Sequence, residues 1–114
     1  MMTFRPWGYF KVHSNGPSYK LKEIIIFPGQ RLSKQFHTSR SEYWTVVEGN
    51  GVAEVDGKEF LLFPGASIYI PSHSVHRAEN NSSEDLKIVE IQMGPLLSDD
   101  DIYRVEDDYG RQNN

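Results

Sequence analysis

The chain has 114 residues, no cysteine and a formal net charge of −4, and this length fits one domain. The lack of cysteine excludes disulfides, thiolate metal sites and a cysteine nucleophile, and no basic patch indicates a nucleic-acid partner. No apolar run approaches the roughly 20 residues of a membrane span, and the first residues lack the pattern of a secretory signal. We therefore expect a soluble, cytoplasmic protein that binds neither nucleic acid nor membrane.

Short runs rich in β-branched and aromatic residues alternate with Gly, Pro, Asn and Ser, which is typical of strands joined by turns. Asp56-Gly57 lies between two such runs and predicts a two-residue hairpin. One stretch is helical in pattern: Ser98 caps three aspartates that suit the first turn of a helix. The sequence predicts an antiparallel all-β sandwich or barrel, with a short helical turn and tail at its end. The expected strands are 8–12, 19–26, 31–37, 42–48, 52–55, 58–62, 67–70, 76–80 and 86–93.

Charge is distributed unevenly along the chain. Residues 1–95 carry ten basic and ten acidic side chains, whereas residues 96–114 carry six acids and two arginines. The negative excess therefore lies in the tail, and charge alone favours a solvated surface segment there. We expect a single domain over residues 1–114, made of a barrel over 5–95 and a tail over 96–114.

Four potential metal ligands fall on three of the predicted strands. Gln35 and His37 are two residues apart, so in a strand their side chains share a face. Glu42 opens the next strand and His76 opens a later one. Nitrogen and oxygen donors of this kind suit zinc, manganese, iron, cobalt or nickel better than calcium. The spacing alone leaves open hydrogen-bonded core histidines and a solvated glutamate.

Two longer patterns resemble the cupin motifs. The first comprises Gly29, Gln35, His37, Glu42 and Gly49, and the second comprises Gly65, Pro71, His76 and Asn80. Gln35 stands where the common motif has its first histidine, and it still offers an oxygen ligand. The resemblance implies a cupin fold, which is a double-stranded β-helix or jelly-roll barrel. It also implies one divalent metal, zinc in the first place, held by Gln35, His37, Glu42 and His76.

Further segments narrow the resemblance. The chain opens with Arg5-Pro6-Trp7-Gly8, carries Leu32-Ser33-Lys34-Gln35-Phe36-His37, and closes with a patterned segment over residues 102–111. Together these resemble the type II mannose-6-phosphate isomerase domain, which in its family commonly follows a mannose-1-phosphate guanylyltransferase domain. The implied reaction interconverts mannose 6-phosphate and fructose 6-phosphate through an enediol. These 114 residues contain no glycine-rich phosphate loop, so we exclude GDP-mannose synthesis by this chain alone.

The isomerisation needs a base near the reacting carbons and cations for the phosphate. Glu48 shares strand parity with Glu42 and is the first candidate base, with Asp107 or Asp108 as alternatives. We expect the tail to close over the barrel mouth and exclude water. We expect the tail to be needed for turnover. We expect it to be dispensable for metal binding, because all four ligands precede Ser98. The tail residues assigned to catalysis are Arg104 and Arg111, and the substrate-binding candidates are Ser33, Lys34, Arg40 and Arg77. Arg77 adjoins His76, so alternation points it outward and favours a structural ion pair.

Other function classes stay open at this point. One is a metal-containing sugar-binding or regulatory cupin without catalysis. Another is a different cupin enzyme, such as a sugar-nucleotide isomerase or epimerase, or an iron dioxygenase. We expect a small phosphorylated sugar as ligand and a homodimer, because exposed sheet edges favour pairing. His13 and His73 are interpreted as surface residues.

Overall fold

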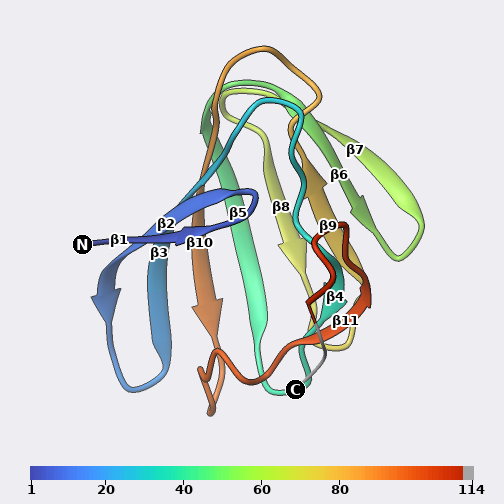
Figure 1. The fold of residues 1–114 in the computed structure, drawn as a ribbon. Helices are drawn as coiled ribbons and strands as arrows, with labels where there is room; N and C mark the ends of the chain where they lie inside the picture. Colours follow the sequence, from blue (N-terminus) through green and yellow to red (C-terminus); the bar gives the residue numbers. More distant parts are fainter. Residues whose placement is uncertain (112–114) are drawn as a thin grey trace.

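The computed structural model describes residues 1–111, which form eleven strands and no helix, in two antiparallel sheets that face each other (Figure 1). The first sheet has the order β1-β2-β3-β10-β5-β8 and the second has the order β11-β4-β9-β6-β7. The predicted all-β architecture is confirmed. The strands are β1 (Met2–Arg5), β2 (Gly8–Asn15), β3 (Tyr19–Ile26), β4 (Lys34–Phe36), β5 (Ser41–Glu48), β6 (Gly51–Val55), β7 (Lys58–Leu62), β8 (Ser67–Ile70), β9 (His76–Glu79), β10 (Leu86–Met93) and β11 (Tyr103–Glu106).

Two differences from the predicted strands matter for the site. The strand β1, which was not predicted, pairs with β2 through a tight turn in which Arg5 faces Gly8. The strand expected over 31–37 shortens to β4, because residues before it contact β9 only at isolated points. These points are a bridge from Arg31 to Glu79 and a hydrogen bond from the Leu32 amide to the Ala78 carbonyl.

The tail differs from its prediction. The expected helical turn is one hydrogen-bonded turn, in which the Asp101 amide donates to the Ser98 carbonyl at 3.1 Å. The Ser98 hydroxyl does accept the Asp100 amide, but the chain then extends into β11. That strand lies beside β4 at the edge of the second sheet (Figure 1). Residues 103–106 are therefore a paired strand, although charge alone favoured a solvated segment.

Two glycines occupy positions that suit a residue without a side chain: one has a left-handed backbone conformation in a turn, and the other lies very close to a neighbouring backbone. The predicted hairpin at Asp56-Gly57 is confirmed, with φ values of 49° and 83° between the paired ends of β6 and β7, as a type I′ turn requires. At Gly94, which follows β10, an added Cβ would lie 2.3 Å from the Ser39 carbonyl oxygen. The absent side chain therefore lets the chain pass directly against the turn between β4 and β5.

The space between the sheets changes character along its length. In β10 the inward residues Leu86 and Ile88 are fully buried and apolar, whereas the next two inward residues are Glu90 and Gln92. β3 changes in the same way, from buried isoleucines to Lys22. One end is therefore a dry core, and the other is a polar chamber. Within residues 1–111 no helix is long and apolar enough to cross a membrane.

Candidate metal centre and substrate pocket

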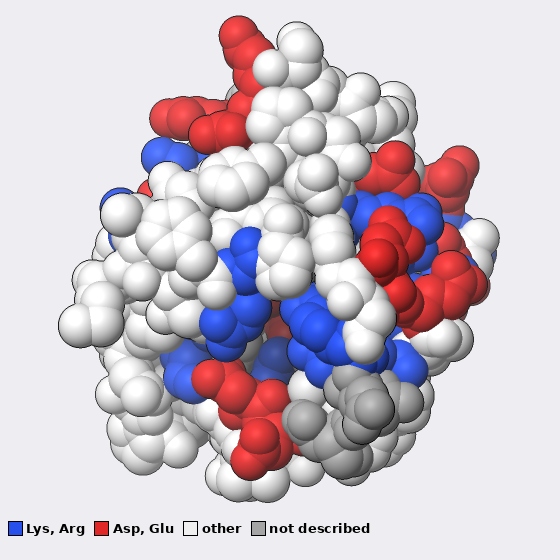
Figure 2. All heavy atoms as spheres, viewed as in Figure 1, with Lys and Arg blue, Asp and Glu red and all other residues white. Residues whose placement is uncertain are grey.

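A cavity of about 120 Å³ lies at the polar end, between the two sheets and beneath the N-terminal and C-terminal segments. Lys and Arg side chains gather around a hollow near the centre of the face seen in Figure 2. The lining residues combine apolar walls with charged groups of both signs, which is typical of a site that binds a small polar ligand. The charged and polar residues that line it are Arg5, Lys22, Ser33, Gln35, His37, Arg40, Glu42, His76, Glu90, Asp99, Arg104 and Arg111.

Three predicted ligands meet at the floor of this pocket. Donor atoms of His37, Glu42 and His76 all lie within 4.8 Å of one another. The Nε2 atom of His37 is 3.3 Å from Glu42 Oε2, and the Nε2 atom of His76 is 3.6 Å from Glu42 Oε1. All three side chains are buried, so a metal held there would be shielded from bulk solvent.

Gln35 lies beside these three residues through sheet pairing. It is opposite His76 on β9 and opposite Arg104 on β11. Residues opposite one another in a sheet share a face, so these three side chains form one row across the second sheet. The Gln35 amide nitrogen donates to the Ser33 carbonyl at 3.2 Å. This contact holds the amide in place and leaves its oxygen for another partner.

Backbone carbonyls fix the orientation of both imidazole rings. The Nδ1 atom of His37 is 2.6 Å from the Asp101 carbonyl oxygen, and the Nδ1 atom of His76 is 2.8 Å from that of Ser74. A carbonyl only accepts, so each Nδ1 carries the proton and each Nε2 offers its lone pair toward Glu42. Burial lowers the pKa of His37 to about 4, helped by the Arg40 charge, and burial also lowers the pKa of His76. Both rings are therefore neutral at pH 7, as a metal requires.

These side chains fit a divalent cation. Two neutral imidazoles, one carboxylate and one amide oxygen are all ligands that zinc and related transition metals accept. Each imidazole already donates its remote N–H to a carbonyl, which is the usual outer support of a metal-bound histidine. The structure contains a possible metal site formed by His37, Glu42 and His76, which are three of the four ligands assigned from the sequence.

A second carboxylate lies next to the ligand Glu42. The Trp44 indole N–H donates to Glu42 at 3.1 Å and to Glu90 at 3.0 Å, and the Gln92 amide donates to Glu90 at 2.7 Å. Burial raises the pKa of Glu90 to about 7, and the nearby Glu42 charge adds to this effect. Glu90 is therefore a buried carboxyl group that can hold or release a proton near neutral pH.

Cations from separate parts of the chain surround the rest of the pocket. Arg40 donates to Glu42 at 2.9 Å, while Arg5 and Lys22 come from β1 and β3. Arg104 and Arg111 come from the C-terminal segment, where burial and then the Arg111 charge lower the pKa of Arg104. Like charges held this close favour an anionic ligand between them.

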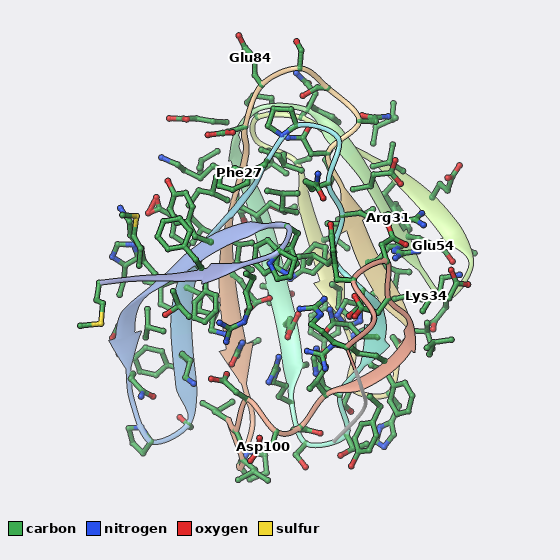
Figure 3. The ribbon with its side chains drawn as sticks, in the orientation of Figure 1. Phe27, Arg31, Lys34, Glu54, Glu84 and Asp100 are labelled. Atoms are coloured by element: carbon green, nitrogen blue, oxygen red, sulfur yellow. The ribbon has the colours of Figure 1, made fainter. Side chains whose placement is uncertain are left out.

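Three predicted site residues do not line the pocket. Glu48 has a side chain that is 69% exposed and lies 3.8 Å from Lys87 on the outside, so its assignment as the base is corrected. Lys34 is 3.1 Å from Glu54 on the outer face of the second sheet (Figure 3). Arg77 donates to the Leu32 carbonyl and to Glu106. The expected structural ion pair of Arg77 is present, and its assignment to the substrate is corrected along with that of Lys34.

The alternative bases also have other partners. Asp107 lies 2.8 Å from Arg111, and Asp108 accepts a bidentate contact from Arg31. His13 pairs with Glu23 at the surface, and His73 has a positive φ of 72° in an exposed turn. None of these four side chains lines the pocket.

Three charged residues of the pocket were not predicted from the sequence: Glu90, Lys22 and Arg5. The first two follow the inward parity of apolar neighbours: Glu90 is two residues from Ile88, and Lys22 is two residues from Ile24. A charged residue on the inward face of a strand indicates a functional pocket, and this signal was available. Arg5 had no comparable signal, because its position depends on β1.

The comparisons with known proteins agree with this geometry. The family model described as mannose-6-phosphate isomerase C-terminal matches residues 1–107. The alginate biosynthesis protein AlgA of Pseudomonas aeruginosa is 45% identical over 109 residues, which are 96% of this chain and 23% of that protein. A mannose-1-phosphate guanylyltransferase of Klebsiella pneumoniae is 40% identical over 108 residues, which are 95% of this chain and 23% of that protein. The chain thus spans about a quarter of the length of these curated relatives.

Solved structures confirm the fold. The capsular polysaccharide assembling protein CapF of Staphylococcus aureus superposes with a TM-score of 0.76 at 20% identity, over 94% of this chain and 34% of that one. A Klebsiella pneumoniae protein with a double-stranded β-helix domain gives a TM-score of 0.73 at 20% identity, over 84% of this chain and 82% of that one. The predicted cupin fold is therefore confirmed.

Proposed function

The chain belongs to the family of mannose-6-phosphate isomerase C-terminal domains, and from this premise we propose that it is a metal-dependent aldose–ketose isomerase. The substrate is mannose 6-phosphate and the product is fructose 6-phosphate. The observation that carries the proposal is the buried cluster of His37, Glu42 and His76 at the floor of a cation-lined pocket. A metal at the floor and an anion site above it match a phosphorylated sugar.

We propose that Gln35, His37, Glu42 and His76 hold one divalent ion, with zinc as the first choice. Such an ion supplies a Lewis acid for the carbonyl or diol oxygens of the sugar. The protein holds the ligands in register: Gln35 faces His76 across β4 and β9, and the two Nδ1 contacts set the rings.

The phosphate end of the sugar is assigned to the cations at the pocket mouth. Arg104 and Arg111 line the pocket from the C-terminal segment, and Arg5 lines it from the opposite terminus. The Ser33 hydroxyl is buried and has no hydrogen-bond partner among residues 1–111. An unsatisfied buried hydroxyl is costly unless a ligand pairs with it, which supports a polar ligand between Ser33 and these arginines.

Proton transfer is assigned to Glu90 in place of Glu48. Enediol chemistry needs a group that takes a proton from one carbon and returns it to the next. Of the three pocket carboxylates, Glu42 belongs to the ligand set and the Asp99 side chain is 64% exposed. Glu90 is 5% exposed, so of the two carboxylates outside the ligand set it is the one protected from solvent.

The C-terminal segment is proposed to cover the bound sugar. Ile102 adds an apolar side chain to the lining between the turn at residue 98 and β11. Tyr109 donates its hydroxyl proton to the Gln30 side chain at 2.6 Å and anchors the far end of the segment. A covered pocket protects an enediol from water.

A coupled assay tests this proposal. Fructose 6-phosphate formation from mannose 6-phosphate is measured on the chain stripped of metal with a chelator and then reloaded with zinc. We expect turnover only after reloading, and much weaker turnover of unphosphorylated mannose. A reloaded chain that binds mannose 6-phosphate without converting it contradicts the isomerase and favours a sugar-binding cupin. Conversion of a sugar nucleotide alone favours the other cupin enzyme class.

The homodimer and the cytoplasmic location remain predictions. The outer face of β5 and β8 carries Tyr43 and Tyr69, whose rings are 4.9 Å apart and about half exposed. An apolar outer face supports pairing of two copies. Light scattering at micromolar concentration should give twice the chain mass, and a monomer mass would refute the dimer.

A further inference from the structure

The turn after β10 contacts the metal-ligand strands through one buried residue. Asp101 is 6% exposed and lies 64 positions after His37 in the sequence. Its backbone and its side chain both bind the connection between β4 and β5. That connection runs from the ligand His37 to the ligand Glu42.

The Asp101 carboxylate fixes the backbone of this connection. It accepts hydrogen bonds from the Thr38 amide at 2.9 Å, the Thr38 hydroxyl at 3.0 Å and the Ser39 amide at 2.9 Å. An ionised carboxylate with three donors holds two successive residues in one conformation.

The Asp101 carbonyl fixes the ring of His37. Its oxygen lies 2.6 Å from Nδ1, which keeps the proton on that nitrogen and directs Nε2 toward Glu42. One residue thus sets both the tautomer of a ligand and the backbone that follows the ligand.

Neighbouring contacts hold Asp101 against this connection. The Ser98 carbonyl accepts from Arg40 at 3.3 Å, and Lys22 lies 3.6 Å from Asp99. Gly94 permits the close approach to Ser39 described above. Residues 98–101, which lie at the lower edge of Figure 3 where Asp100 is labelled, are therefore joined to β3 and to the ligand connection.

We propose that Asp101 is a positioning residue of the metal centre, and this rests on the metal site of the proposed function. It acts through His37 and the turn to Glu42, without contact to the ion. From the sequence, the tail is predicted to be dispensable for metal binding because all ligands precede it. On this proposal, the tail supplies the outer support of one ligand and sets the metal affinity.

Zinc affinity of four proteins tests the proposal: the unaltered chain, Asp101→Ala, Asp101→Asn and the matched control Asp100→Ala. The affinity is measured by competition with a chromophoric chelator at pH 7. Asp101→Ala keeps the carbonyl that accepts from His37 and removes only the carboxylate that holds Thr38 and Ser39. We therefore expect zinc binding to weaken by about 10-fold, the lower end of the 10–100-fold range typical of lost outer-sphere support. Asp101→Asn keeps one acceptor oxygen and should lie between Asp101→Ala and the unaltered chain. Asp100→Ala should stay within twofold of the unaltered chain.

A second readout separates this proposal from the metal site itself. In metal-free protein, long-range ¹H–¹⁵N NMR reports which nitrogen of His37 carries the proton. We expect Nδ1 in the unaltered chain and a weaker preference for Nδ1 in Asp101→Ala, because the carbonyl of residue 101 is then no longer held against the ring by the carboxylate contacts to Thr38 and Ser39. An unaltered chain that does not bind zinc contradicts the proposed metal site, while the tautomer still tests Asp101. Zinc affinity of Asp101→Ala within twofold of the unaltered chain overturns the proposal. Should Asp101→Ala fail to fold, the same twofold criterion applies to Asp101→Asn.

Discussion

The same strands form both ends of the barrel interior, but the two ends differ in the polarity and charge of their inward side chains. At the dry end the inward side chains of β10, β5 and β3 are aliphatic and almost fully buried: Ile26, Val46, Leu86 and Ile88. At the polar end the same strands present Lys22, Glu42 and Glu90. Trp44 lies between the two ends, because its ring belongs to the core and its N–H binds both carboxylates.

The dry end contributes most of the stability, and the polar end carries the candidate functional site. Each fully buried aliphatic side chain contributes about 1.5–3 kcal/mol to folding, so the dry end favours the folded state strongly. Burying a carboxylate costs free energy unless hydrogen bonds and opposite charges offset the cost. The raised pKa of Glu90 indicates that this offset is incomplete. A strand that is apolar at one end and charged at the other therefore indicates a site.

The largest effect should come from removing two ligands at the polar end. We expect His37→Ala with His76→Ala to reduce bound metal from about one equivalent to almost none, because only Gln35 and Glu42 remain. Elemental analysis after gentle purification measures this. The matched control replaces His13 and His73, which lie outside the pocket, and should keep its metal. Unchanged metal in the ligand variant would refute the assignment.

Removal of the proposed proton-transfer group should come next. General acid–base groups contribute about 10²–10⁴-fold to rate, so we expect Glu90→Gln to lower kcat by that range with metal still bound. The control Glu48→Gln should retain the full rate, because Glu48 lies outside the pocket. Equal loss of rate in both variants would contradict the distinction between them.

The stability of the metal-free Glu90→Gln variant provides a second test of the role of Glu90. The folded-state pKa of Glu90, about 7, lies above the ordinary glutamate value of 4.5. Its contribution to stability is therefore full below pH 4.5 and is lost as the pH rises through 7. Above pH 7, Glu90→Gln should be at least as stable as the unaltered chain. A marked loss of stability there would show that Glu90 is a structural residue.

A cavity at the dry end should affect stability alone. We expect Ile88→Ala to lower the free energy of unfolding by about 2–5 kcal/mol, because Ile88 is fully buried. Metal stoichiometry should not change. Ile91→Ala makes the same truncation on the outer face of the same strand, where the residue is 38% exposed, and should cost much less. Denaturant unfolding compares the two, and equal losses would contradict the core described here.

The smallest expected effect concerns the ion pair between Asp107 and Arg111 in the C-terminal segment. The hydrogen bonds from Arg111 lower the pKa of Asp107 from 3.8 to about 2. A lowered folded-state pKa contributes stability above pH 3.8 that is lost as the pH falls toward 2. Asp107→Asn should therefore be less stable by at most about 2 kcal/mol at pH 7, with the difference vanishing near pH 2. A difference that is constant over this range would contradict the ion pair.

Local signals in the sequence predicted the sheet architecture, whereas the residues of the metal cluster were predicted from their spacing together with the resemblance to the cupin motifs. Hairpin residues, strand alternation and ligand spacing can be identified without knowing which strands pair. The Glu48 assignment failed for a specific reason. The pairing of β5 with β10 shifts register between Lys87 and Ile88, and a bulge of this kind ends the alternation that placed Glu48 with Glu42.

Other parts of the site could not be predicted locally. Arg5 reaches the pocket through β1, and Asp101 reaches His37 across 64 positions. Glu90 was different, because its inward parity with Leu86 and Ile88 was visible in the sequence. It was missed because no short motif surrounds it.

Anomalous X-ray diffraction from zinc-loaded crystals, recorded at the zinc edge, is the decisive test of the proposed metal site. We expect one strong peak at the polar end, within bonding distance of Gln35, His37, Glu42 and His76. A zinc-loaded crystal with no peak among these four side chains, or with its only peak elsewhere, would contradict it.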